Sequence, residues 1–223
     1  MRLTAEDHAR VTAAVAAAEA DTAGEIVTVV ARRSDKYHDV AAHWSLLAVL
    51  LVLAILSGWP ALAERIHAAY ADAWTQTASP SALFTIALLL CTLAFLGARL
   101  LLASSAVRLA LTPGATKARR VRARALDLFR ASAEQRTVGR TGVLLYLSLD
   151  ERRAELIADE AIHSKVTPDT WGAAMAALIE AVRDGRPGDG LAAAIERIGA
   201  VLAPHFPRAE NDVNELPDRL IEL

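Results

Sequence analysis

Two long apolar stretches decide the fold of this chain: WSLLAVLLVLAILSGWPALA at residues 44–63 and SALFTIALLLCTLAFLGARLLLA at residues 81–103. A helix needs about 20 mostly apolar residues to cross the hydrocarbon core of a bilayer. The first stretch has no charged residue, and the second has only Arg99, which lies near enough to its end to reach the headgroups. We therefore predict two transmembrane helices that form a hairpin. The alternative is a pair of buried core helices, but a chain of 223 residues is too small to surround them.

The composition supports a membrane protein and excludes several other classes. Hydrophobic residues make up 54% of the chain, more than is usual for a soluble domain. The formal net charge of −2 provides no broad positive field, so we expect no nucleic acid partner. Cys91 is the single cysteine, which excludes disulfide bridges and cysteine-based zinc sites.

Basic residues are concentrated on one side of the predicted hairpin. The connector between the two stretches carries only Arg65, whereas many basic residues precede the first stretch or follow the second. Because cytoplasmic segments are enriched in Lys and Arg, we predict two spans in a bacterial inner membrane, with both termini cytoplasmic. The flanking basic residues are Arg32, Arg33, Lys36, Arg108, Lys117, Arg119, Arg120, Arg122 and Arg124.

Residues 115–136 are predicted to form a basic helix. Its basic residues act either as an orientation signal alone or also as contacts to anionic headgroups, each worth about 1 kcal/mol near a membrane surface. The apolar residues between them fit packing rather than base stacking, which again argues against nucleic acid. The predicted membrane-surface residues are Lys117, Arg119, Arg120, Arg122 and Arg124.

The remaining segments predict one small soluble domain that the hairpin interrupts. The runs at 25–31 and 142–149 predict two buried strands, which are joined through a helix and should therefore be parallel with a right-handed crossover. Residues 154–158 predict a third strand, antiparallel to the second after a short turn. Further helices are predicted to begin near Thr4, Thr167 and Asp189. We expect a small mixed sheet with helices on its faces.

These elements divide the chain into four parts. Residues 1–40 contain the first helix and strand, 41–110 the hairpin, 111–206 the remainder of the domain, and 207–223 a tail. The tail is turn-rich but contains Leu216, Leu220, Ile221 and Leu223. Apolar residues of this kind predict a tail that packs on its own domain, with docking to a partner as the alternative.

Several motifs resemble those of the TPM domain family, which is named for a thylakoid lumen protein, a photosystem II repair protein and a nematode receptor modulator. The motifs are Gly24-Glu-Ile-Val, Arg140-Thr-Gly-Val-Leu-Leu, Leu149-Asp-Glu-Arg-Arg, the run DGRPGDGL at 184–191, and the tail segments His205-Phe-Pro and Asn214-Glu-Leu-Pro. The tail is similar to that of a bacterial membrane branch of the family. The resemblance implies an α/β/α sandwich, here interrupted by a two-helix transmembrane hairpin. It also implies either an acid phosphatase activity, as described for plant members, or a role in complex repair or receptor modulation.

The carboxyl ends of the two predicted parallel strands mark the edge where a site is expected. Asp35, Asp150 and Glu151 follow these strands, and Asp159 and His163 follow the third. Clustered carboxylates of this kind bind Mg²⁺ or Ca²⁺ or share a proton. The catalytic candidates are Asp35, Asp150 and Asp159, and the metal candidates are Asp150, Glu151 and Asp159. The alternative is that these are ordinary turn acids paired with Arg33, Arg152 or Arg153.

Two functions are compatible with these patterns. The first is a non-enzymatic, membrane-anchored interaction module in the assembly or quality control of membrane protein complexes, with a membrane protein or a second copy as partner. The alternative is a phosphatase or other hydrolase with a metal-assisted carboxylate site. Because the chain passes from the first strand directly into the hairpin, we expect the carboxyl edge of the sheet to face the bilayer. The sequence contains neither a phosphate-binding glycine loop nor a G-x-S-x-G nucleophile elbow.

Overall fold

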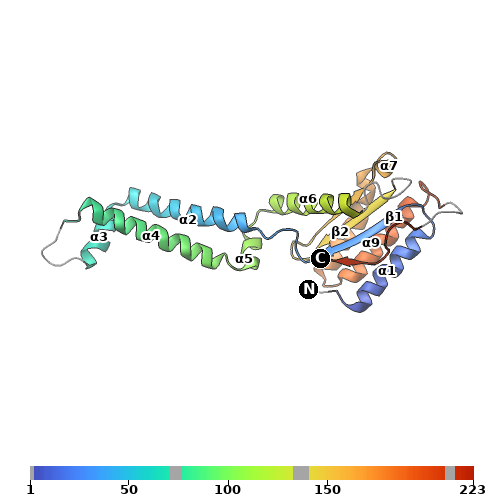
Figure 1. Ribbon diagram of the computed structural model, residues 1–223, viewed down its shortest axis with the longest axis horizontal. Helices are drawn as coiled ribbons and strands as arrows, with labels where there is room; N and C mark the ends of the chain where they lie inside the picture. The colour runs from blue at the N-terminus through green and yellow to red at the C-terminus, as the bar shows by residue number, and fades with distance from the viewer. Residues whose placement is uncertain (1–2, 71–76, 133–140, 209–213) are drawn as a thin grey trace. The chain divides into compact units, whose positions relative to one another are not determined.

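A computed structural model describes residues 3–70, 77–132, 141–208 and 214–223 of the chain (Figure 1). It contains two compact units. One is helical and spans Lys36–Pro113, and the other is an α/β unit formed by Met1–Asp35 and Gly114–Leu223. The helical unit therefore lies within the sequence of the α/β unit.

The helical unit consists mainly of two long apolar helices that pack along each other, α2 (His38–Gly58) and α4 (Pro80–Leu101). Both are long and apolar enough to span a membrane. The shorter helices are α3 (Ala61–Tyr70) and α5 (Ser105–Ala110). The first long helix begins before the predicted residue 44 and ends at Gly58, because Pro60 cannot continue it. Residues 61–63, predicted as part of that span, belong instead to α3.

The sheet of the α/β unit has the strand order β3-β2-β1-β4. Strands β1 (Glu25–Ala31) and β2 (Gly142–Ser148) are parallel, with Glu25 opposite Gly142 and Ala31 opposite Ser148. Strand β3 (Arg153–Ala158) is antiparallel to β2. These three strands and their directions confirm the sequence prediction. The fourth strand, β4 (Ile221–Glu222), pairs with β1 and was not predicted.

Helices cover both faces of the sheet, which makes the unit an α/β/α sandwich (Figure 1). Alternate residues of β1 and β2 point to opposite faces, and both strands are buried throughout. One face packs against α1 (Ala5–Glu19), α8 (Gly172–Arg183) and α9 (Pro187–Leu202), and the other against α6 (Gly114–Ser132). Two short helices, α7 (Glu160–His163) and the 3₁₀ turn Pro168–Trp171, connect β3 to α8.

The tail packs on its own domain. Leu216 and Leu220 are buried, and the amide of Leu223 donates to the carbonyl of Val30 at 2.9 Å. The carbonyl of Leu223 in turn accepts from the amide of Arg32 at 3.3 Å. These contacts confirm the first reading of the tail, and they extend the sheet beyond β1.

Candidate functional site

The parallel ladder continues past the carboxyl ends of β1 and β2. The amide of Leu149 donates to the carbonyl of Ala31 at 3.0 Å, and that of Asp150 donates to the carbonyl of Arg32 at 2.9 Å. The loop that leaves β1 and the turn that follows β2 are therefore held side by side. Asp35, Asp150 and Glu151 consequently lie at the same edge of the sheet, as predicted.

The carboxylate of Asp150 is paired with an arginine of the neighbouring loop. Its Oδ2 atom accepts from Nε and Nη2 of Arg33 at 3.1 and 2.9 Å, and Nε of Arg32 lies 3.7 Å away. The side chains of Arg33 and Asp150 are only 19% and 27% exposed. A two-nitrogen contact at this degree of burial is stronger than a solvent-exposed ion pair. Asp150 therefore lies in a turn and forms an ion pair with Arg33.

The carboxylate of Glu151 is buried and fixes the same loop. Its Oε1 atom accepts from the amide of Ser34 at 3.0 Å, and its Oε2 atom accepts from the hydroxyl of Ser148. The hydroxyl of Ser34 lies 3.0 Å from that of Tyr146. Burial raises the pKa of Tyr146, so its hydroxyl stays protonated at neutral pH. Through these hydrogen bonds, Glu151 links the β2–β3 turn to the loop after β1.

The third acid at this edge, Asp35, binds the helix on the far face of the sheet. Its Oδ2 atom accepts from Nη1 of Arg120 at 2.6 Å, and its side chain is 42% exposed. Of the acids at this edge it is the one most open to solvent. Arg120, which was predicted to lie at the membrane surface, is therefore engaged in an ion pair.

The other basic residues of α6 lie outside the stripe of the helix that packs on the sheet. Val121, Ala125 and Phe129 form the buried stripe against the sheet. Arg122 is 63% exposed and lies 3.3 Å from a carboxylate oxygen of Glu155. Arg119 and Arg124 are exposed, and Lys117 is partly exposed. The structure therefore leaves Lys117, Arg119, Arg122 and Arg124 accessible to a charged surface, but not Arg120.

The placement of Asp159 beside Asp150 was wrong. Asp159 follows β3, which runs antiparallel to β2, so it lies at the amino end of β2. There its Oδ2 atom accepts from the amide of Gly142 at 3.1 Å, and the residue is 6% exposed. The length of β2 separates this position from Asp150, about 20 Å at the usual rise per residue. His163, one turn later in α7, belongs to the same distant edge.

The proposed metal ligands therefore do not form one set. Asp150 and Glu151 lie at the carboxyl edge, whereas Asp159 lies at the amino edge. Within the described residues, no three His, Cys, Asp or Glu side chains come together as metal ligands. A Mg²⁺ or Ca²⁺ ion at the carboxyl edge would rely on Asp35, Asp150 and Glu151, and each of these carboxylates already accepts from a donor of the chain.

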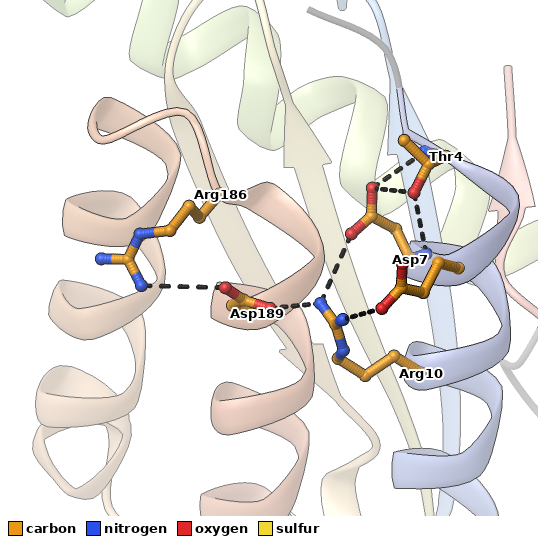
Figure 2. Close-up of polar contacts among 6 residues, drawn as sticks. Thr4, Asp7, Arg10, Arg186 and Asp189 are labelled. Atoms are coloured by element: carbon orange, nitrogen blue, oxygen red, sulfur yellow. Dashed lines mark hydrogen bonds and ion pairs between the residues drawn. The ribbon is translucent and has the colours of Figure 1, made fainter.

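A polar network also ties α1 to α9 (Figure 2). Arg10 contacts Glu6 at 2.8 Å and Asp7 at 3.6 Å on its own helix, and it reaches Asp189 on α9. Asp7 also closes a capping box with Thr4, whose amide and hydroxyl both lie 2.8 Å from its Oδ2 atom. These hydrogen bonds lower the pKa of Asp7. The sequence predicts a helix that begins near Thr4, but it does not predict the link between Arg10 and Asp189.

Glu19 is a buried carboxyl group that the sequence pattern does not indicate. Only 8% of the residue is exposed, its Oε1 atom accepts from the amide of Ile26 at 2.7 Å, and its Oε2 atom has no hydrogen-bond partner among the described residues. Burial raises the pKa of Glu19 to about 8, and the nearby carboxylates of Glu25 and Asp218 act in the same direction. Glu19 is the last residue of α1, which is weakly amphipathic, so the sequence pattern does not predict its burial.

Comparison with known proteins identifies the domain. Residues 104–201, from just before α5 to near the end of α9, match the TPM domain family. This chain carries a TPM domain. The match confirms the resemblance found in the sequence motifs. Because the TPM match begins after the hairpin, β1 and α1 lie outside it in sequence although they belong to the same folded unit.

The chain is also similar to a solved structure, the NMR structure of the BA42 protein from the psychrophilic bacterium Bizionia argentinensis. The two chains share 19% sequence identity with a TM-score of 0.58, over 100% of this chain and 97% of the other. At this identity the likeness shows the fold alone. No curated protein sequence matches the chain.

Proposed function

We propose that this TPM domain is a membrane-anchored interaction module that acts in the assembly or quality control of membrane protein complexes. The observation that carries the proposal is the apolar surface of α2 and α4. Leu51, Phe84 and Leu88 are 59%, 76% and 67% exposed, and no residue of α4 is buried. Exposed apolar surface on this scale marks a membrane or a protein partner. Lipid around both helices would cover it.

The basic face of α6 supports contact with anionic lipid headgroups on the cytoplasmic side. Lys117, Arg119, Arg122 and Arg124 are at least partly exposed, and each would add about 1 kcal/mol of attraction near an anionic surface. The distribution of Lys and Arg around the two spans supports cytoplasmic termini in a bacterial inner membrane. In this arrangement, α2 and α4 lie in the bilayer, and the α/β/α sandwich is available to bind a partner.

The state of the acids at the carboxyl edge favours recognition over catalysis. Asp150 is paired with Arg33, Glu151 binds Ser34 and Ser148, and Asp35 is paired with Arg120. A general acid or base needs a proton that it can exchange with substrate, and carboxylates held by internal donors are poorly suited to this task. Instead, these contacts make a rigid edge for a partner, which we take to be another membrane protein or a second copy.

Extraction of the full chain from native membranes in lipid particles tests this function. We expect a membrane protein at constant stoichiometry, or a dimer of the chain, after affinity purification and measurement of the particle mass. Replacing Asp35 and Arg120 together, as Asp35→Asn and Arg120→Gln, removes a surface ion pair without changing charge and serves as the matched variant. A lone monomer in both preparations would contradict the proposal.

The second candidate is metal-assisted phosphoester hydrolysis at the carboxyl edge. Its specific support is that Asp35, Asp150 and Glu151 share this edge, with Asp35 partly open to solvent. Hydrolysis of a phosphomonoester is measured with the purified chain and added Mg²⁺ or Ca²⁺, against Asp150→Asn. Asp159→Asn is the control, because Asp159 lies at the opposite end of β2. Activity lost only in Asp150→Asn would overturn the first proposal.

A further inference from the structure

The last part of the tail, residues 214–223, which we call the terminal segment, runs along the outer edge of β1, on the side away from β2. Its strand β4 pairs with β1 over only two residues. Beyond β4, the amide of Leu223 donates to the carbonyl of Val30, and the carbonyl of Leu223 accepts from the amide of Arg32. A short edge strand with few ladder hydrogen bonds opens at a lower free-energy cost than the strands inside a sheet.

Side chains add to the contacts of the terminal segment. Leu220 is buried in the core between the sheet and helices α1, α8 and α9, and Leu216 is buried in the core on the α6 face. Nε2 of His8 lies 3.4 Å from a carboxylate oxygen of Glu222. The amide of Leu216 donates to Oε2 of Glu25, the first residue of β1, at 3.2 Å. The terminal segment is therefore held partly by a buried carboxylate.

A second buried carboxyl group, that of Glu19, lies at the same end of β1. Its Oε1 atom accepts from the amide of Ile26, the residue after Glu25, at 2.7 Å. Glu19 and Glu25 are only 8% and 5% exposed. Oε2 of Glu19 is buried and has no hydrogen-bond partner among the residues that the structure describes. A negative charge on this oxygen would therefore be poorly stabilised.

The charged groups that face Glu19 come from three segments. Glu25 of β1 and Asp218 of the terminal segment both disfavour the ionised form of Glu19. Arg208, which follows α9, favours it, and its Nη1 atom donates to the main-chain carbonyl of Glu19 at 3.3 Å. Burial is the largest effect, and together these causes raise the pKa of Glu19 to about 8. Movement of the terminal segment would take Asp218 away and let water reach the carboxylate of Glu19.

We propose that the terminal segment is a releasable cover on the outer edge of β1, and that ionisation of Glu19 releases it. In the closed state, Glu19 is neutral beside the two neighbouring carboxylates. In the open state, its carboxylate is hydrated, and Val30 and Arg32 present a carbonyl and an amide at the edge of the sheet. An open edge of this kind can pair with an added strand. The proposal concerns the α/β unit and does not depend on the anchoring role.

The direction of the pH effect follows from where the proton binds more tightly. The closed state holds the proton of Glu19 with a pKa of about 8, against an ordinary value of 4.5. Closing is therefore favoured at low pH, and this advantage is lost as the pH rises to 8. Because one proton is released, the equilibrium constant for opening should increase by up to about tenfold for each pH unit between these values.

Amide hydrogen exchange of the full chain in an uncharged detergent tests the proposal between pH 5.5 and 7.5. Protection factors are compared, because the intrinsic exchange rate itself increases with pH. We expect the terminal segment to be less protected than β2 at every pH. Its protection should decrease by up to about 100-fold over this range. Glu19→Gln, which stays neutral, should remove the decrease. Glu196→Gln, which replaces an exposed carboxyl of α9, should retain it.

A second variant acts from the terminal segment itself. Asp218→Asn removes one of the carboxylates that repel an ionised Glu19, so the segment should be more protected at pH 7.5 than in the natural chain. Thermal unfolding at pH 5.5 will show that both variants are folded. Protection that does not change with pH, or that decreases equally in Glu19→Gln, would overturn the proposal. Equal protection of the terminal segment and β2 would also overturn it, because the segment would then open only when the whole unit unfolds.

Discussion

The helical unit and the α/β unit use the same apolar residue types in opposite ways. In the α/β unit, all seven residues of β2 are buried between two layers of helices. In the helical unit, α4 packs along α2, yet none of its 22 residues is buried. A single helix neighbour covers only one stripe of a helix, whereas a sheet strand is covered on both faces. The same apolar residue types therefore form a core in one unit and an exposed surface in the other.

Truncating a leucine to alanine in each unit tests this difference in burial most strongly. Leu145 is fully buried in β2, and Leu88 is 67% exposed in α4. Leu145→Ala should lower the free energy of unfolding by about 3 kcal/mol, because it leaves a cavity in the core. Leu88→Ala should change it by no more than about 0.5 kcal/mol. Chemical denaturation in detergent, followed through the sandwich, measures both. Equal losses would mean that α4 is packed like a core helix.

Introducing a charge into α4 tests the membrane side of the comparison. Leu88→Arg places a charge near the middle of the helix, which costs about 3 kcal/mol for insertion into a bilayer. Leu101→Arg is the matched control at the helix end, where the side chain reaches the headgroups at little cost. Glycosylation-site mapping in microsomes gives the inserted fraction of each chain. Equal insertion of the two variants would contradict a spanning α4.

The buried carboxyl group of Glu19 predicts a pH dependence for the stability of the α/β unit. Because the pKa of Glu19 is raised from 4.5 to about 8, the folded state keeps a proton that the unfolded chain has released. Stability should therefore be greatest below pH 4.5 for this group and decrease as the pH rises to 8, by about 1.4 kcal/mol for each unit. Glu19→Gln should remove this slope, which denaturation at several pH values will measure.

The control for this dependence is Glu196→Gln, which replaces an exposed carboxyl of α9 and should leave the slope unchanged. The charges around Glu19 are those of Glu25, Asp218 and Arg208. A slope that survives Glu19→Gln would assign the effect to one of these neighbours instead.

Substituting one glycine by alanine in each unit is expected to have the smallest effect on stability. A Cβ atom at Gly188 would overlap the carboxylate of Asp7, which closes the capping box of α1, whereas a Cβ at Gly97 in α4 meets nothing within 4 Å. Gly188→Ala should cost about 1 kcal/mol by displacing Asp7. Gly97→Ala should be neutral or slightly stabilising, because alanine favours the helix. Thermal unfolding of both variants decides, and a neutral Gly188→Ala would contradict the tight α1–α9 contact in Figure 2.

Much of the fold could be predicted because periodicity and strand direction are local signals. The apolar runs gave β1, β2 and β3, and the crossover helix made the first two parallel. The two residues of β4 are too few to show any period, so this strand became visible only in the structure. Because β3 is antiparallel to β2, the residue that follows β3, Asp159, lies at the amino end of β2. The predicted strand direction was therefore sufficient to separate Asp159 from Asp150.

The site was less predictable than the fold. Sequence placed Asp35, Asp150 and Glu151 at one edge, but it did not show how Ser34 and Ser148 would bind Glu151. Arg152 of the β2–β3 turn and Arg183 of α8 line one hollow beside this edge, although they are far apart in the sequence. Contacts of this kind depend on the directions of side chains between packed elements. These directions could not be predicted from the order of residues alone.

We propose that α2 and α4 anchor this TPM domain in a lipid bilayer. Alkaline carbonate extraction of membranes that contain the full chain tests it most directly, because carbonate releases peripheral proteins and leaves spanning ones. If α2 and α4 span the bilayer, the chain remains in the membrane pellet and is released only by detergent. Recovery of the chain in the carbonate supernatant as a folded, soluble protein would contradict it.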